Sequence, residues 1–156
     1  MRVETDRMYL YPLSDEEMRF VIEKESDPDM KQAYTEMLEG CLSDPDNRIW
    51  YAIWNMELKD APARIVGDFC FKGLGEDGVI EIGYGLKEEY RHHGYMTEAV
   101  KAITEWALTQ ESVKQVEAET DAENIASQKV LIRAGFVSNG KVGEEGPRFV
   151  YGAENE

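Results

Sequence analysis

The first part of the chain changes from a short apolar run to helical spacing. Residues Met8–Leu13 are apolar or aromatic, which predicts a strand. The run ends at Ser14, and Ser14 with Glu17 has the capping-box form that opens a helix. We expect this helix to extend to about Glu25.

A second helix is predicted directly afterwards. Asp27 and Pro28 combine an N-cap side chain with a proline in the first turn. The spacing of the apolar residues that follow predicts a single buried stripe. Its members are Met30, Ala33, Tyr34, Met37, Leu38 and Cys41. The polar segment Ser43–Asn47 then predicts a turn.

The middle of the chain has the pattern of consecutive strands. Ile49–Met56 and Arg64–Lys72 read as strands joined by a charged loop that contains a proline. Gly73–Gly78 predicts a turn, and Val79–Leu86 a further strand. Three strands without intervening helices indicate an antiparallel meander rather than alternating β and α units.

The helical period returns in the last third. Tyr95–Gln110 places its apolar residues on one face: Met96, Ala99, Val100, Ile103, Trp106 and Ala107. Gln115–Asp121 alternates as a strand, and Asn124–Ala134 predicts a short amphipathic helix that ends at Gly135. Two final strands are expected around Gly143–Pro147.

The predicted order is therefore β-α-α-β-β-β-α-β-α-β-β, a mixed α/β fold of the α+β kind. A chain of 156 residues, of which 42% are hydrophobic, is long enough to bury its own core. We found no internal repeat or linker in the pattern. We expect one domain that covers residues 1–156.

Charge narrows the range of partners. The chain carries 32 acidic and 17 basic residues, a net charge of -15, which repels nucleic-acid phosphates and anionic membrane surfaces. The same field attracts amines, although acidity also serves solubility alone. Cys41 and Cys70 lack metal-ligand spacing, and no segment has the length of apolar sequence that spans a bilayer. We expect a cytoplasmic protein that binds neither nucleic acid nor membrane.

One predicted strand has two very different faces. Within Ile80–Leu86, alternate side chains are large and apolar, whereas the opposite face carries Glu81, Gly83 and Gly85. Glycine weakens a strand interior, so two glycines in alternation indicate that a ligand or another chain segment approaches the backbone closely. The pattern leaves both explanations open.

The loop that follows this strand leads directly into the strongest predicted helix. Helix starts leave backbone N–H groups unpaired and attract anions, and Gly94 lets an anion come close. Neighbouring acidic residues offset the local basic ones, so a phosphate site here would depend on backbone amides more than on lysines. A glycine before a helix is also often only a turn. His92 and His93 are adjacent and point apart, which argues against a shared metal site.

Two motifs resemble those of the GNAT acetyltransferases. Arg91 and Gly94 match the acetyl-CoA-binding pattern of Gln or Arg, two variable residues, Gly, one variable residue, then Gly or Ala; Met96 departs from its last position. Asn124 and Ser127, with a terminal Gly-Phe, resemble the next motif of the branch that acetylates ribosomal-protein amino termini and related amines. The resemblance implies a GNAT-like, mostly antiparallel central sheet flanked by helices.

The resemblance also implies site residues. It places acetyl-CoA's pyrophosphate on the loop and first helical turn, which comprise Arg91, His92, His93, Gly94, Tyr95, Met96 and Thr97. It places the pantetheine beside the Leu86 backbone and within reach of Asn124. Many members have a tyrosine acid seven residues after that Asn, where this chain has Leu131, so Ser127 becomes the candidate acid.

The expected activity is acetyl transfer to a primary amine, of a small molecule or of a peptide or protein amino terminus, by direct attack and without a metal. Glu81 is the candidate base for the amine. Each assignment has a plainer alternative: Asn124 as a helix cap, Ser127 as a surface hydroxyl, and Glu81 as a solvated strand residue. A non-catalytic acyl-CoA-binding or regulatory module of the same fold is the alternative function. We expect a monomer or homodimer.

Overall fold

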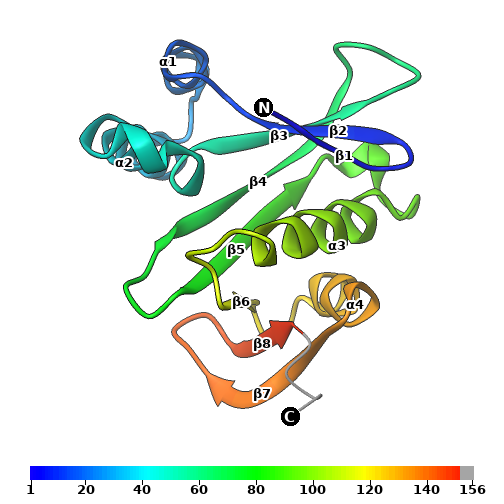
Figure 1. Ribbon diagram of the computed structural model, residues 1–156. Helices are drawn as coiled ribbons and strands as arrows, with labels where there is room; N and C mark the ends of the chain where they lie inside the picture. Colours follow the sequence, from blue (N-terminus) through cyan, green and yellow to red (C-terminus); the bar gives the residue numbers. More distant parts are fainter. Residues whose placement is uncertain (152–156) are drawn as a thin grey trace.

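The computed structural model describes residues 1–151, which form a single eight-stranded sheet with helices on both faces (Figure 1). The strands lie in the order β1-β2-β3-β4-β5-β6-β8-β7. Their bounds are β1 Val3–Glu4, β2 Met8–Pro12, β3 Ile53–Leu58, β4 Ile65–Leu74, β5 Val79–Leu86, β6 Gln115–Glu119, β7 Phe136–Val142 and β8 Pro147–Tyr151. The helices are α1 Asp15–Lys24, α2 Pro28–Ser43, α3 Tyr95–Leu108 and α4 Ile125–Ala134, with 3-10 turns η1 Pro45–Trp50 and η2 Glu88–Tyr90.

The predicted meander is confirmed, because β3, β4 and β5 pair antiparallel in sequence order. The parallel pair in the described sheet is β5 with β6, and α3 connects these two strands as the crossover. Their registered pairs run from Val79 with Gln115 to Ile82 with Ala118. Since β5 continues to Leu86, its last residues extend beyond this pairing. The backbone edge that would face β6 is therefore free there.

The larger core lies between the sheet and α3, which crosses the middle of the sheet in Figure 1. Its centre is aromatic: Trp54 stacks on Phe69 at 5.4 Å between ring centroids, and Phe71 meets Trp54 edge-on at 5.9 Å. Ile103 of α3 is fully buried against this cluster. The amphipathic helix predicted here is therefore confirmed.

A smaller core lies under α1 and α2 on the opposite face of the sheet. Met18 of α1 and Leu38 and Cys41 of α2 pack with Leu13 and Ile53. These helices therefore cover the part of the face formed by β2 and β3. Across the described chain, no helix is both long enough and apolar enough to cross a membrane.

The order of elements agrees with the prediction, with local differences. Ile49 and Trp50, predicted as strand, belong to η1, where the carbonyl of Ile49 accepts a hydrogen bond from the Trp54 indole. The buried stripe predicted for α2 is wrong at Met30 and Ala33, which are exposed because the start of the helix extends past the sheet. β1 was not predicted, since two residues are too short to show a pattern. The expected domain also includes residues 152–156, which lie outside the described residues.

The capping box that orients α1 is present as predicted. The Ser14 hydroxyl accepts a hydrogen bond from the Glu17 backbone N–H at 3.1 Å, and the Glu17 carboxylate accepts one from the Ser14 N–H at 2.8 Å. Ser14→Ala removes one acceptor and leaves a helical donor unpaired.

We expect Ser14→Ala to lower the free energy of unfolding by about 1 kcal/mol, measured by urea denaturation. Ser112→Ala is the control, because Ser112 is exposed and its hydroxyl makes no hydrogen bond within residues 1–151. Equal stabilities for the two variants would contradict the capping role.

Candidate functional site

A cavity of about 650 Å³ opens where β5, the start of α3 and the start of α4 meet. Its walls combine the carboxyl end of one strand with the amino ends of two helices. The lining residues are Tyr84, Gly85, Arg91, His92, Gly94, Tyr95, Met96, Thr97, Asn124, Ile125, Ala126, Ser127, Lys129, Val130 and Arg133. The structure thus brings together the two sequence motifs, which lie on separate helices.

The loop before α3 turns its backbone toward the cavity. His92 and Gly94 both have left-handed backbone conformations, with φ of 70° and 77°. Gly94 is the N-cap of α3 and supplies no side chain to bond the first-turn amides. Those amides belong to residues that line the cavity, and the positive end of the helix dipole lies there too. The geometry suits a phosphate group.

The side chains around the cavity reinforce this positive end. Arg91 of the loop and Lys129 and Arg133 of α4 line it, and no acidic side chain of the described residues does. For a chain with net charge -15, this is a local reversal of sign. The sequence prediction that a phosphate site would depend on backbone amides more than on lysines counted only neighbours along the chain, and α4 adds Lys129 and Arg133 to the lining. The spacing of Lys129 and Arg133, four residues apart on one helix face, was the missed signal.

The N-terminal segment holds the loop in place. The Arg7 guanidinium donates to the His93 carbonyl at 2.9 Å and pairs with Glu98 of α3 at 2.7 Å. Burial opposes ionisation of Glu98, but hydrogen bonds from Thr5 and Arg7 outweigh it and hold the pKa of Glu98 below its usual value. Glu98 is thus neutralised by a partner. His93 contributes its carbonyl to this anchor, whereas its exposed ring packs beside Tyr95 and does not line the cavity.

Two hydroxyl groups meet at the cavity beside the start of α4, one from α4 and one from β5. Asn124 is the N-cap, and its side-chain oxygen accepts from the Ser127 backbone N–H at 3.0 Å. The Tyr84 hydroxyl donates to the Ser127 carbonyl at 3.0 Å and lies 2.8 Å from the Ser127 Oγ. Burial raises the pKa of Tyr84 to about 12, so the phenol stays protonated at neutral pH.

Tyr84 is a site residue that the sequence reasoning missed, because alternation along β5 placed it only on the packed face. Leu131, at the position where many GNAT members have tyrosine, is fully buried and outside the cavity lining. A tyrosine hydroxyl therefore enters the site from β5 and not from α4.

Glu81 lies on the opposite face of β5 and does not line the cavity. Its two carboxylate oxygens pair with Lys72 at 2.9 Å and with Arg148 at 3.2 Å. Arg148 also pairs with Glu117 and Glu119 of β6. Glu81 is therefore part of an ion-pair network across four strands, and the structure does not bring it together with Ser127.

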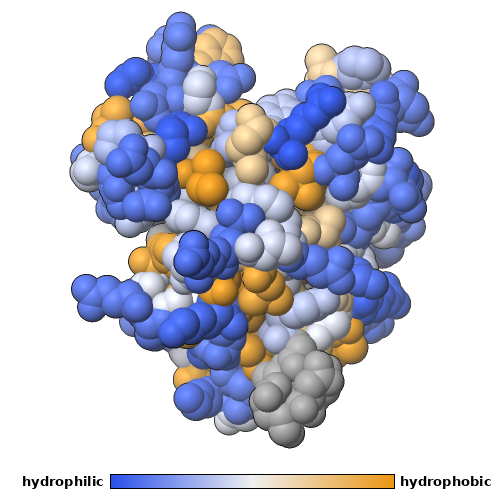
Figure 2. Space-filling view, in the orientation of Figure 1, coloured by the Kyte–Doolittle hydropathy of each residue, from blue (hydrophilic) through white to orange (hydrophobic). Residues whose placement is uncertain are grey.

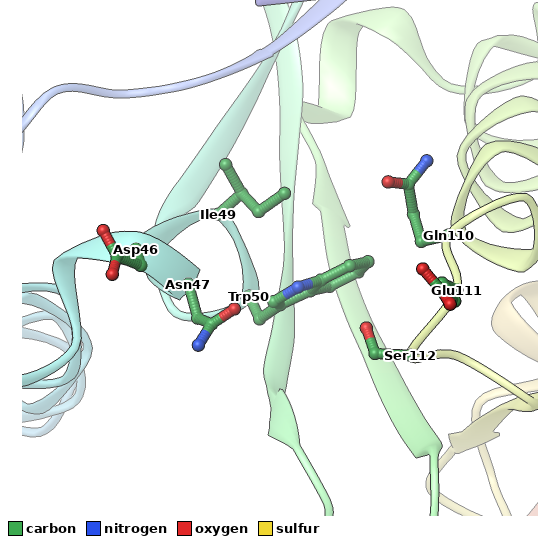
Figure 3. Close-up of a pocket in the computed structure, with 7 residues that line it drawn as sticks. All are labelled: Asp46, Asn47, Ile49, Trp50, Gln110, Glu111 and Ser112. Carbon is green, nitrogen blue, oxygen red and sulfur yellow. The ribbon is translucent and has the colours of Figure 1, made fainter.

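A second, shallower hollow of about 440 Å³ lies near the other end of α3 (Figure 3). The buried Trp50 side chain lies between Asp46 and Asn47 on one side and Gln110, Glu111 and Ser112 on the other. Within residues 1–151, no group of three or more His, Cys, Asp or Glu side chains is arranged to hold a metal ion.

The fold and the cavity together define a mixed α/β domain with an electropositive cavity at a helix start. Comparison with known families makes this specific: residues 2–137 match the family model described as an acetyltransferase (GNAT) domain. The chain belongs to the GNAT acetyltransferase family, as the two sequence motifs predicted.

Individual relatives agree with this assignment. An uncharacterized N-acetyltransferase of Bacillus subtilis (strain 168), YjdG, is 40% identical over 92 residues, which cover 58% of this chain and 54% of that protein. The chain thus spans about half the length of this curated relative, and a smaller share of a probable N-acetyltransferase, YjcK, from the same organism.

Two solved structures share the fold at low identity. RimL, a ribosomal L7/L12 alpha-N-protein acetyltransferase in complex with coenzyme A, has a TM-score of 0.73 at 13% identity and covers 97% of this chain and 96% of its own. A chimera of the spermidine N-acetyltransferase SpeG from Vibrio cholerae and hSSAT has a TM-score of 0.70 at 14% identity, covering 92% and 94%. These likenesses establish the mixed, mostly antiparallel GNAT sheet.

The hydrogen-bonded pair of Tyr84 and Ser127 joins β5 to α4 across the cavity. Tyr84→Phe keeps the ring and removes the hydroxyl, so we expect it to lower the free energy of unfolding by roughly 0.5–1.5 kcal/mol in urea denaturation. Tyr51→Phe is the matched control, since Tyr51 is half-buried and its hydroxyl bonds no residue within 1–151. A Tyr84→Phe protein as stable as this control would show that the contact contributes nothing.

Proposed function

We propose that this protein is an acetyl-CoA-dependent N-acetyltransferase that transfers the acetyl group to a primary amine by direct attack. One observation supports it most: the cavity at the start of α3 combines free helix amides with an all-cationic set of charged side chains, beside the free edge of β5. This matches the negative charge of the coenzyme's phosphate groups. The GNAT family to which the chain belongs uses acetyl-CoA.

The proposed binding mode uses the two ends of the cavity. The amides of Arg91–Thr97 and the cationic side chains of Arg91, Lys129 and Arg133 bind the pyrophosphate. The pantetheine adds as an extra strand along Gly83–Leu86, where β5 has lost its pairing with β6. The Asn124 side-chain oxygen caps α4, so its amide N–H₂ group is left to donate to the pantetheine.

The chemical step needs a neutral amine and a leaving group that is protonated. The amine nitrogen attacks the thioester carbonyl carbon, the C–N bond forms, and the C–S bond breaks with its electron pair on sulfur. In this proposal the Ser127 hydroxyl supplies a proton to the thiolate and takes up the proton that leaves the acetylated nitrogen, while the Tyr84 hydroxyl beside it donates a hydrogen bond to the serine oxygen. The protein forms no covalent intermediate.

The acceptor is proposed only as a primary amine, of a small molecule or of a peptide or protein amino terminus. The two structural neighbours named above act on a ribosomal protein and on spermidine by their names, which span this range. Action in the cytoplasm, and a monomeric or homodimeric state, are predictions from the sequence that go with this proposal.

The alternative is a domain that binds acyl-CoA without turnover. The deciding experiment incubates the protein with acetyl-CoA and a panel of polyamines, amino acids and ribosomal-protein amino-terminal peptides, and searches by mass spectrometry for an added acetyl group. Acetylation of any amine above the uncatalysed rate supports the enzyme. Tight acetyl-CoA binding with no acetylated amine would support the binding module.

The phosphate loop makes a specific prediction for binding. Gly94→Glu places a side chain and a negative charge at the helix start where the pyrophosphate would lie. We expect the dissociation constant for acetyl-CoA, measured by calorimetry, to rise about tenfold or more, which corresponds to about 1.4 kcal/mol.

Gly140→Glu is the matched control for backbone strain. Gly140 has a left-handed φ of 79°, close to the 77° of Gly94, and a side chain there meets no atom within 4 Å. A folded Gly94→Glu protein that binds acetyl-CoA as tightly as Gly140→Glu would refute the proposed loop.

Ser127 makes a prediction for turnover. If its hydroxyl protonates the thiolate, Ser127→Ala should lower kcat about 100-fold and leave the acetyl-CoA dissociation constant nearly unchanged, because the interaction strengthens only as charge develops. Tyr84→Phe should also lower kcat, and the double variant should lose less than the two single losses combined, since the two groups act as a unit. Equal losses in binding and turnover would assign Ser127 to positioning the coenzyme instead.

A further inference from the structure

The sheet face opposite the cavity contains a polar strip that α1 and α2 leave partly uncovered. These helices pack over β2 and β3. The strip beyond them is formed by alternate residues of β4 and β5 that share this face through their antiparallel register. It comprises Asp68, Cys70 and Lys72 of β4 with Glu81, Gly83 and Gly85 of β5.

Among the β4 members of this strip, Asp68 lies nearest the free part of β5. It is registered directly opposite Gly85, so the two residues lie side by side on one face. An Asp68 carboxylate oxygen lies 3.7 Å from the position that a Gly85 side chain would occupy. Gly85 also lines the acetyl-CoA cavity through its backbone. A carboxylate therefore stands beside the stretch of β5 to which the thioester arm is assigned, with no side chain between them.

The two carboxylates of the strip differ in their partners. Both oxygens of Glu81 already pair with cations, so Glu81 must lose an ion pair to bind a proton. Asp68 is half-buried and makes no hydrogen bond or ion pair within residues 1–151. Burial raises the pKa of Asp68, and the positive charge of Lys87 offsets only part of that effect. An unpaired, partly desolvated carboxylate is a better proton acceptor than a paired one.

The other groups that face Asp68 stay uncharged near neutral pH, apart from Lys87. The pKa of Tyr34 in α2 is raised, mainly because the phenol is buried and also because it lies near the charge of Asp68. Burial likewise raises the pKa of Cys70 to about 11. Asn55, registered opposite Asp68 on β3, does not titrate. Asp68 is therefore the group of this set whose ionisation changes on the acidic side of neutrality.

We propose that Asp68 binds the acceptor ammonium group and removes its proton, so that the acceptor reaches the thioester from the α2 side of the sheet. This inference rests on the proposed acetyl transfer. Gly85, which carries no side chain, leaves room for the amine to pass from Asp68 to the carbonyl carbon.

The groups already named account for every proton that the reaction moves. The acceptor enters as an ammonium ion, and one N–H proton passes to the Asp68 carboxylate, which frees the nitrogen lone pair for the new C–N bond. As the C–S bond breaks, the Ser127 hydroxyl gives its proton to the sulfur. A second proton then leaves the acetylated nitrogen and, through the hydroxyls or solvent, replaces the proton that Ser127 lost. Protonated Asp68 returns its proton to water. The products are an amide, free coenzyme A and one proton.

Asp68→Asn tests the proposal because it keeps the shape and removes the base. Using an amine that the unmodified protein acetylates, we expect kcat/KM at neutral pH to fall about 100-fold while the acetyl-CoA dissociation constant is unchanged. Asp68 acts as a base only above its folded pKa, so the activity of the unmodified protein falls as pH drops through that value. For Asp68→Asn, kcat/KM should instead rise about tenfold per pH unit up to the pKa of the amine, since only neutral amine reacts.

Controls separate this role from a structural one. Asp60→Asn, at an exposed carboxylate without a hydrogen bond or ion pair within residues 1–151, should keep the pH profile. Asp68→Asn should unfold at no lower urea concentration, because it removes a charge that burial disfavours. In Asp68→Ala, added formate should restore part of the rate by filling the vacated space.

The outcomes are distinct. No acetylation by the unmodified protein would reject the proposed function. An active protein whose Asp68→Asn variant keeps both rate and pH profile would reject Asp68 as the base. If Glu81→Gln, and not Asp68→Asn, shows the pH-dependent fall in kcat/KM, the base is Glu81 instead.

Discussion

The structure depends above all on the end of pairing between β5 and β6. The two strands are registered as far as Ile82 and Ala118, and β5 then continues to Leu86 paired with β4 on its other edge. Unpaired backbone N–H and C=O groups inside a sheet are costly unless a partner or water satisfies them. Here the free edge lies beside a cavity, so a ligand with amide groups of its own completes the sheet. The glycines of β5 and the start of α3 both lie beside this gap.

Electrostatics separates the cavity from the rest of the molecule. The surface seen in Figure 2 is largely hydrophilic, and the chain as a whole is strongly acidic, yet the charged residues of the cavity are all basic. The general field repels a polyanion such as the proposed coenzyme, whereas the charged residues of this cavity attract it. The anchor formed by Arg7 and Glu98 keeps the nearby acidic residue of α3 neutralised. Local pairing therefore creates a positive site without changing the sign of the whole protein.

Much of the fold and part of the site were readable from the sequence, because their causes are local. Helix caps such as Ser14 and Asn124 act within three residues, and the loop around Gly94 is defined by the turn into one helix. The extra cations of α4 and the hydroxyl of Tyr84 reach the cavity only through packing between distant elements. The position of Asp68 opposite Gly85 depends on the register between β4 and β5, which alternation along one strand does not determine. Ile49 was misassigned because a turn and a buried strand share apolar composition.

The position of the cavity and of Asp68 on opposite faces of β5 has a kinetic consequence. If the coenzyme and the acceptor bind as proposed, each has its own entrance, so neither blocks the other and a ternary complex can assemble in either order. After transfer, the two products can also leave independently. An inhibitor that joins coenzyme A covalently to an amine would have to thread between β5 and β6, passing through the sheet where the pairing ends.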